Sequence, residues 1–287
     1  MISALLRILG ASRPLSWVNT AFPFLAAYLV TGGGMDTRFY LGTFFFLIPY
    51  NIAMYGINDV FDFESDILNP RKGGVEGTVL AREHHRTLLW AAAISCLPFV
   101  VYLYAVGTRA SGIWFTMSLF ALLAYSVPGL RFKERPFLDS VTSSVHFVSP
   151  ALVAGTMIPG GVNTWFMWCM VAFFLWGMAS HALGAIQDVT ADRQGGLSSI
   201  ATVLGARTTA RLATAQYLVA SLILFLLPHP SWIAGLVILP YAINSARFRF
   251  ITDETCTRAR SGWRFFLYIN FFAGSVLSIT MLWVGLR

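Results

Sequence analysis

Long runs without a charged side chain dominate the pattern of apolar and polar positions along this chain. A helix needs about 20 mostly apolar residues to cross the hydrocarbon core of a bilayer, and most of the runs approach that length. Two runs, 212–228 and 231–246, lie at or below the lower limit, so they either cross or form a re-entrant pair. The pattern predicts nine membrane-spanning helices, over 15–32, 39–57, 88–107, 110–130, 140–158, 164–187, 212–228, 231–246 and 265–286.

The first run has a second interpretation, because Arg7 and Arg13 precede it as basic residues precede the apolar part of a cleaved signal peptide. Eight further runs follow it, so we expect this segment to stay in the protein as a span. Composition agrees with a membrane protein: 56% of the 287 residues are hydrophobic, 11% are charged and the mean hydropathy is +0.66. An ordinary soluble domain has about 25% charged residues. No long linker interrupts the chain, which predicts one all-α membrane domain over 1–287.

Basic residues decide the expected orientation in the membrane. With the N-terminus and the loops at 58–87, 131–139, 188–211 and 247–264 on one face, that face holds 17 of the 20 basic residues. The positive-inside rule makes this face cytoplasmic. The formal charge of +7 is therefore a topology signal, and nucleic-acid binding is a poor interpretation of it. The same face holds 12 of the 13 acidic residues, which contribute little to orientation and need another explanation.

Many of these acids gather at two points. Asp59, Asp62 and Asp66 are spaced i, i+3 and i+7 on a helix that continues past residue 57, so they project from one helix face. Asp188 and Asp192 are spaced i and i+4 and do the same. Asp188 lies 129 residues after Asp59 (188 − 59), four predicted spans later. An even number of spans places both sets on one membrane face, as a parallel internal repeat requires.

A cation is expected beside these carboxylates, since like charges repel and an unpaired carboxylate near hydrocarbon is costly. Mg²⁺ takes one or two carboxylates and completes its shell with water and substrate phosphates. Two facing carboxylate sets bridged by Mg²⁺ would form a receptacle for a diphosphate. A solvated acidic loop is the alternative for either set alone, and the recurrence of the second set favours metal.

Basic side chains near these acids would hold the diphosphate oxygens that the metal ions leave free. They are Arg71, Lys72, Arg131, Lys133 and Arg193, and each also serves as an ordinary cytoplasmic charge. Tyr125 is a further candidate hydrogen-bond donor, although tyrosine is common at membrane interfaces. The segment RKGGVEG is not a Walker loop, because it lacks a GKS or GKT ending and follows no predicted strand.

Three motifs carry a resemblance to a known family. NDVFDFESD at 58–66 resembles the NDxxDxxxD motif of the UbiA superfamily of intramembrane prenyltransferases, and DVTADRQGG at 188–196 resembles its DxxxD motif with a trailing glycine. YSVPGLRFKERP at 125–136 is similar to the Tyr-and-Lys segment between them. The resemblance covers essentially the whole chain. It implies an all-helical bundle of nine spans around a central cavity.

The residues around the motifs indicate which subgroup of the superfamily the chain resembles. The first motif is followed by NPRKGGVEGTVL at 69–80 where most members with aromatic acceptors have an Arg-Pro-Leu type segment. Three segments resemble those of bacterial lycopene elongases: this one, SRPLSWVNTAFPF at 12–24 and LSSIATVLGAR at 197–207. The expectation is Mg²⁺-dependent transfer of dimethylallyl groups from dimethylallyl diphosphate to lycopene, giving acyclic forty-five- and fifty-carbon carotenoids. Another lipid or an aromatic ring is the alternative acceptor.

The resemblance also implies roles for individual residues. The expected Mg²⁺ ligands are Asp59, Asp62, Asp66, Asp188 and Asp192. The residues expected to orient and neutralise the diphosphate are Asn58, Arg71, Lys72, Tyr125, Arg131, Lys133 and Arg193.

Alkylation of lycopene would leave a tertiary carbocation that ends by losing a proton or capturing water. His146 and His181, the two histidines inside predicted spans, are candidate proton acceptors, and helix–helix hydrogen bonding is their alternative role. The predicted catalytic set is Asp59, Asp62, Asp188 and His146. An acceptor as long as lycopene predicts a cavity open to the bilayer. From a different class, a transporter or divalent-cation channel with its acids at a cytoplasmic mouth stays open.

Overall fold

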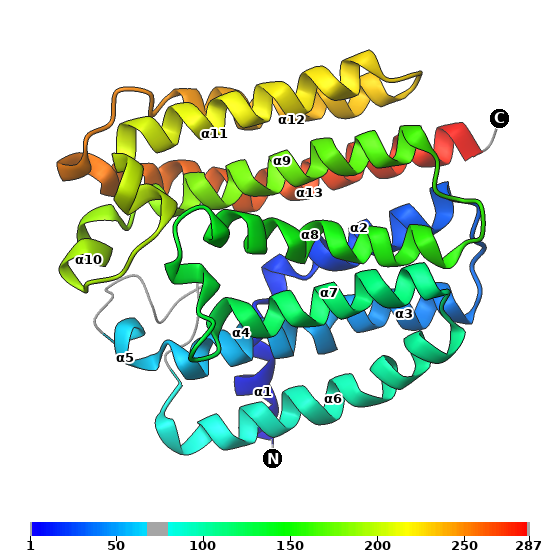
Figure 1. Ribbon diagram of the computed structural model, residues 1–287, viewed down its shortest axis with the longest axis horizontal. Helices are drawn as coiled ribbons and strands as arrows, with labels where there is room; N and C mark the ends of the chain where they lie inside the picture. Colours follow the sequence, from blue (N-terminus) through cyan, green and yellow to red (C-terminus); the bar gives the residue numbers. More distant parts are fainter. Residues whose placement is uncertain (1, 68–79, 286–287) are drawn as a thin grey trace. The chain divides into compact units, whose positions relative to one another are not determined.

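The computed structural model describes residues 2–67 and 80–285, and every regular element within these ranges is helical. This confirms the predicted all-α class for the described chain (Figure 1). The main helices are α1 (Ile2–Ala11), α2 (Val18–Val30), α3 (Thr37–Leu47), α4 (Pro49–Phe61), α5 (Phe63–Asp66), α6 (His85–Val106), α7 (Arg109–Ser126), α8 (Leu138–Met157), α9 (Thr164–Ile186), α10 (Val189–Gln194), α11 (Ile200–Leu226), α12 (Ser231–Ala246) and α13 (Arg260–Gly285). Short 3₁₀ turns are η1 (Pro14–Ser16), η2 (Arg82–His84), η3 (Phe132–Glu134) and η4 (Asp253–Ala259).

Each predicted apolar run falls on one or two of these helices. Five helical stretches in the described residues are both long and apolar enough to cross a bilayer: Thr37–Phe61, Arg82–Val106, Thr164–Ile186, Ile200–Leu226 and Asp253–Trp283. Pro14–Val30 and Ser231–Ala246 are apolar but shorter. The chain is thus a multi-pass membrane protein, and the count of nine crossings stays a prediction.

One predicted loop is wrong. Residues 188–211 are mostly helical, because α10 occupies part of them and α11 begins at Ile200. Ser199 caps α11 by accepting a hydrogen bond from the backbone N–H of Thr202, and the helix continues through the exposed Arg207 and Arg211. Long basic side chains reach water from a helix end, so charge there does not stop a span. Helix α11 is kinked at Gly205, whose φ of 75° and ψ of 159° are not helical, and the run 212–228 begins within the part of α11 that follows this kink.

The chain divides into two compact units, residues 1–131 with 149–161 and residues 132–148 with 162–287. Helix α8 contributes its first part to the second unit and its last part to the first. The prediction of a single domain over 1–287 is untested by this division.

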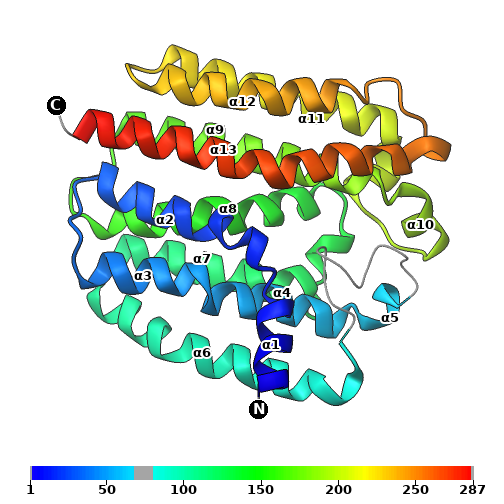
Figure 2. The same cartoon turned by 180° about the vertical axis from the view of Figure 1, so that it is seen from behind.

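In the first unit, α4 is the central helix. It contacts α3, α6 and α7 (Figure 1), and α1 lies against it near the N-terminus (Figure 2). The core is aromatic, with Phe24, Phe45, Phe46, Tyr50 and Phe115 almost completely buried. Ring pairs within this set lie 4.9–6.3 Å apart between centroids, mostly tilted or edge-on, as aromatic packing prefers. This core fixes the position of α4, whose C-terminal end carries the first acidic motif.

The predicted span of 39–57 is broken at Ile48, between α3 and α4. Pro49 has no N–H and sits at the first position of α4, where helices tolerate it. The break exposes backbone carbonyls inside an apolar region, and Asn51 covers them. Its Nδ2 donates to the carbonyl oxygens of Phe46 at 2.8 Å and Leu47 at 3.0 Å. Asn51 thus satisfies the backbone where the helix is interrupted.

At the start of α3, Asp36 is the N-cap. Its Oδ1 accepts the backbone N–H of Phe39 at 3.0 Å, and its Oδ2 accepts from Arg38 at 2.7 Å and from the Tyr28 hydroxyl at 3.0 Å. Burial alone would raise the pKa of Asp36, but these hydrogen bonds outweigh it and lower the pKa below its ordinary value. Asp36 therefore holds α3 most strongly when ionised.

In the second unit, α11 is the central helix and packs along α9 and α12 (Figure 1). Alanines on α9 and α11, including Ala179, Ala182, Ala210 and Ala213, are fully buried. Small residues let helix backbones approach closely, which is how helices associate in lipid. Helix α13 packs on α9 and α12. This packing positions the end of α9, where the second acidic motif begins.

Candidate active site

The first acidic motif lies at the C-terminal end of α4. The helix continues past residue 57 as predicted, but only to Phe61: it is interrupted at Asp62, and the four-residue α5 follows from Phe63. The placement of Asp59, Asp62 and Asp66 on one helix face stays a prediction. Asp59 and Asp62 are 2% and 5% exposed. Two carboxylates this deeply buried need compensation by cations, donors or metal.

Two arginines lie beside these carboxylates. Arg13 Nη2 donates to Asp59 Oδ1 at 2.8 Å, and the Arg13 guanidinium lies 4.4 Å from the centre of the Tyr55 ring. Arg131 Nη2 lies 3.8 Å from Asp62 Oδ1. Both arginines adopt left-handed backbone angles, with φ of 52° and 41°. This backbone conformation is energetically unfavourable for residues other than glycine, and residues strained in this way concentrate at functional sites.

Asn58 connects the motif to α7. Its Nδ2 donates to Asp62 Oδ2 at 2.5 Å and to Ser126 Oγ at 3.0 Å. Ser126 is the last residue of α7, next to the half-buried Tyr125. The structure therefore brings Asn58, Asp59, Asp62 and Arg131 together, all of them predicted site residues, and it places Tyr125 one residue from this contact.

Sequence reasoning did not single out Arg13 or Ser126. Arg13 is 46 residues from Asp59 in the chain, so no local spacing joins them. The available signal was an Arg-Pro pair at 13–14, just before the first apolar run. Three predicted positions are not covered: Arg71 and Lys72 lie outside the described residues, and so does the side chain of Asp66.

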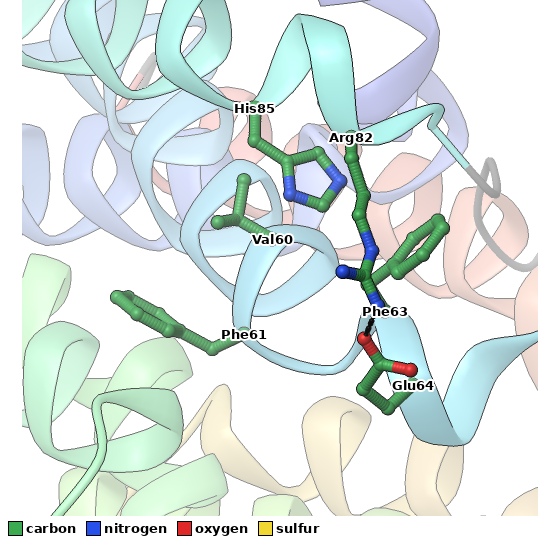
Figure 3. Close-up of a pocket in the computed structure, with 6 residues that line it drawn as sticks. All are labelled: Val60, Phe61, Phe63, Glu64, Arg82 and His85. Atoms are coloured by element: carbon green, nitrogen blue, oxygen red, sulfur yellow. Dashed lines mark hydrogen bonds and ion pairs between the residues drawn. The ribbon is translucent and has the colours of Figure 1, made fainter.

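A small pocket lies beside this motif, between α5 and the start of α6 (Figure 3). Its volume is 230 Å³ and its lining includes Phe63, Glu64, Arg82 and His85. Glu64, the remaining acid of the 59–66 cluster, forms an ion pair there with Arg82. The Glu64 side chain is 71% exposed and the Arg82 side chain is 69% exposed. An ion pair this exposed contributes little to stability. The pocket is a surface feature, and the predicted central cavity stays a prediction.

The second motif lies where α9 passes into α10. Asp188 precedes the first residue of α10, and Asp192 lies within it. The backbone N–H of Asp192 bonds to the Asp188 carbonyl at 2.8 Å, so the i, i+4 helical spacing is confirmed. Both acids are half-buried. Each is accessible enough to meet a ligand.

Arg193 makes contacts that sequence reasoning did not anticipate. Its Nη1 donates to Asp253 Oδ2 at 2.6 Å, and its Nη2 donates to the Thr202 carbonyl at 2.6 Å. Asp253 Oδ1 also accepts the backbone N–H of Ala206 at 2.7 Å. Arg193 therefore joins α10 to η4 and to the first turn of α11, and its diphosphate role stays a prediction.

The remaining predicted residues lie in the second unit. Lys133 is a half-buried residue of η3. His146 lies on α8 and is 4% exposed. His181 lies on α9, and its Nε2 is 3.4 Å from Asp139 Oδ2.

The donor chemistry of the two motifs fits Mg²⁺. Carboxylate oxygens are its preferred protein ligands, and one or two of them suffice when substrate phosphates supply the rest. Within the described residues no three His, Cys, Asp or Glu side chains form a metal-sized group, and the side chain of Asp66 is not among those searched. The full ligand set stays a prediction.

An apolar all-helical chain with buried carboxylates at a helix end has the features of an intramembrane enzyme that binds a charged substrate. Residues 20–272 match the UbiA prenyltransferase family, and the chain belongs to that family. It is 56% identical over 283 residues to a lycopene elongase/hydratase of Corynebacterium glutamicum, covering 98% of each chain. It is 52% identical over 275 residues to the C(50) beta-cyclic carotenoids biosynthesis protein LbtBC of a Dietzia species, covering 95% of this chain and 63% of that longer one.

Solved structures of the family show the same fold. A UbiA homolog from Archaeoglobus fulgidus, bound to DMAPP and Mg²⁺, aligns with a TM-score of 0.67 at 17% identity over 94% of this chain and 99% of that one. The apo structure of a UbiA homolog from Aeropyrum pernix K1 aligns with a TM-score of 0.69 at 17% identity, over 96% and 99%. These likenesses concern the fold alone.

The family assignment decides between the classes of function. The resemblance drawn from the motifs is confirmed, and so is the interpretation of the chain as a prenyltransferase. The rival interpretation as a transporter or cation channel is set aside.

Proposed function

We propose that this protein transfers dimethylallyl groups from dimethylallyl diphosphate to lycopene in a Mg²⁺-dependent reaction, giving acyclic forty-five- and fifty-carbon carotenoids. The observation that carries the proposal is the 56% identity to a lycopene elongase/hydratase along 98% of both chains. The matched region, 98% of this chain, is long enough to include both acidic motifs. A relative 31% identical over 214 residues, from Haloferax volcanii, has the same name.

The metal would be held by Asp59, Asp62, Asp66, Asp188 and Asp192. Bound Mg²⁺ would neutralise the negative charge that develops on the departing diphosphate. Arg13 and Arg131 already balance the first motif, so this end of α4 presents carboxylates and cations together. Arg71, Lys72, Lys133, Arg193 and Tyr125 would contact the diphosphate oxygens. The opening would face the cytoplasm, with the N-terminus on the same side.

The chain's apolar side chains would protect the allylic cation. Water would quench such a cation, so the reaction needs a dry site with aromatic faces. Lycopene is comparable in length to the hydrocarbon thickness of about 30 Å, and it would enter sideways from lipid, one end at a time. A cavity open to the bilayer is part of this proposal.

After alkylation the acceptor carries a tertiary cation. It ends by losing a proton, which gives an alkene, or by capturing water, which gives an alcohol. His146 and His181 are the candidate proton acceptors inside the spans. The name of the Corynebacterium relative includes hydratase activity, so both products belong in the assay.

The experiment is expression of the gene in lycopene-producing cells, with mass spectrometry of the extracted pigment. We expect forty-five- and fifty-carbon products from the wild-type chain. Asp59→Ala and Asp188→Ala should abolish them while the protein still inserts. Glu254→Ala, an exposed acid of η4 outside both motifs, is the control and should retain them.

An inserted, stable protein that leaves lycopene unchanged would remove the elongase assignment. In that case the same membranes should be tested with other lipid or aromatic acceptors and dimethylallyl diphosphate. Activity retained by Asp59→Ala and Asp188→Ala would remove the metal assignment instead.

A further inference from the structure

Among the acids that the structure describes and the proposed reaction leaves unused, Asp139 is the most deeply buried. Its side chain is 0% exposed, although it lies next to the first residue of α8. A carboxylate in this environment is stable only when donors surround it. Its partners therefore show what the surrounding structure is built to hold.

Two of these partners are backbone groups at helix starts. Asp139 Oδ1 accepts the N–H of Ser140 at 2.7 Å, and Oδ2 accepts the N–H of Ile200 at 2.7 Å. Ile200 is the first residue of α11, where the helix dipole favours negative charge. The carboxylate is thus fixed in place by two helices of the same unit.

The third neighbour is a histidine on α9. His181 Nε2 lies 3.4 Å from Asp139 Oδ2, and the His181 side chain is 16% exposed against 0% for Asp139. A carboxylate at this distance from an imidazole stabilises the imidazolium that forms when the ring takes up a proton. A fixed carboxylate that orients a histidine is a recurrent way to prepare a general base.

Position along α9 relates His181 to the second acidic motif. His181 lies five residues before the end of α9 at Ile186, and Asp188 follows in the turn between α9 and α10. His181 is therefore in the last two turns of α9, inside the predicted span and before the second acidic motif.

We infer that His181 is the proton acceptor that ends the carbocation, and that Asp139 is the positioning residue that orients it. This inference rests on the proposed function. The C–H bond on the carbon beside the cationic centre breaks, its electron pair forms the new carbon–carbon double bond, and the proton goes to the imidazole of His181. The imidazolium that results is stabilised by the Asp139 carboxylate. Of the two histidines, His146 lies on α8 and is 4% exposed, whereas His181 lies beside the fixed carboxylate of Asp139.

The test measures two quantities with purified protein, lycopene, Mg²⁺ and dimethylallyl diphosphate. One is pyrophosphate release, and the other is the amount of prenylated alkene formed per pyrophosphate released. His181→Gln should lower the second quantity about tenfold or more, since a positioned base contributes at least that much. Pyrophosphate release should continue, with the prenyl group recovered on the carotenoid as the tertiary alcohol that water capture gives. Asp139→Asn should change the same ratio in the same direction.

A matched control uses the same substitution elsewhere in the second unit. His229→Gln, in the turn between α11 and α12 next to Trp283, should change neither quantity. Asp139→Asn also alters two backbone contacts, so its unfolding temperature is measured in parallel. His181→Gln keeps the test decisive if the Asp139 variant does not fold.

Two results would overturn the inference. An unchanged alkene-to-pyrophosphate ratio in His181→Gln means that another group takes the proton. A parallel fall of pyrophosphate release and alkene means that His181 supports the fold or the ionisation step. A wild-type protein that forms no prenylated carotenoid refutes the proposed function, a distinct outcome.

Discussion

The ion pair between Arg13 and Asp59 offers the sharpest test of the site's electrostatics. Asp59 is almost completely buried, with a side chain 1% exposed, whereas the Arg13 side chain is 18% exposed. Replacing Arg13 by Met keeps most of its volume and removes its charge. The variant leaves a carboxylate inside the protein without the cation at 2.8 Å.

The size of the effect follows from opposing contributions. At 2.8 Å and an effective dielectric constant of about 20, the attraction is roughly 6 kcal/mol, and desolvation offsets much of it. Breaking a buried pair typically costs about 3–5 kcal/mol, and partial exposure of Arg13 places the expected loss near 3 kcal/mol. In an Asp59→Asn background, Arg13→Met should cost only about 1 kcal/mol, mainly for the lost contact with the Tyr55 ring.

A double-mutant cycle measures this difference directly. Unfolding free energies of the wild type, both single variants and the double variant are obtained from reversible unfolding in mixed micelles by circular dichroism. We expect a coupling of about 2 kcal/mol between the two positions. A coupling below about 0.5 kcal/mol, the usual error of additivity, would refute a direct interaction between Arg13 and Asp59.

Two further predictions concern stability away from the acidic motifs. Asp36→Asn keeps a capping side chain but removes the charge that pairs with Arg38 at the start of α3, and should lower the unfolding free energy by up to about 1 kcal/mol at neutral pH. The pKa of Asp36 is lower in the folded state than in the unfolded state. The wild type should therefore have the higher unfolding free energy above about pH 4, and this difference should be lost as pH falls through the folded-state pKa. A difference that persists at low pH would contradict this in a pH series. Gly177→Ala should cost about 1–3 kcal/mol, because a Cβ there would lie 2.3 Å from Ser144 Oγ and 3.1 Å from its Cα, forcing α8 and α9 apart. Gly274→Ala, with nothing within 4 Å, is the control in a thermal-unfolding series, and an equal loss in both would contradict the packing argument.

The helices and the acidic motifs could be predicted from the sequence because their signals are local. Asp59 and Asp62 follow an apolar run at helical spacing, and the structure places both at the end of α4. The prediction from the local sequence was wrong where basic residues lie within a helix. Arg207 and Arg211 suggested a loop, yet α11 passes through both, since a helix end at the membrane surface accommodates basic side chains. Pro49 similarly divides one predicted span into α3 and α4.

Counter-charges could not be predicted, because they come from distant parts of the chain. A run of acids shows that compensation is needed and does not show which residue supplies it. For Asp59 the cation is Arg13, 46 residues away on a strained turn before η1. For Asp139 the donors include the N–H of Ile200, 61 residues away at the start of α11. Such groups are set by how helices pack, so they appear only in the folded structure. In a chain with 11% charged residues, a buried carboxylate without a nearby sequence partner marks where that packing has brought in a donor from elsewhere.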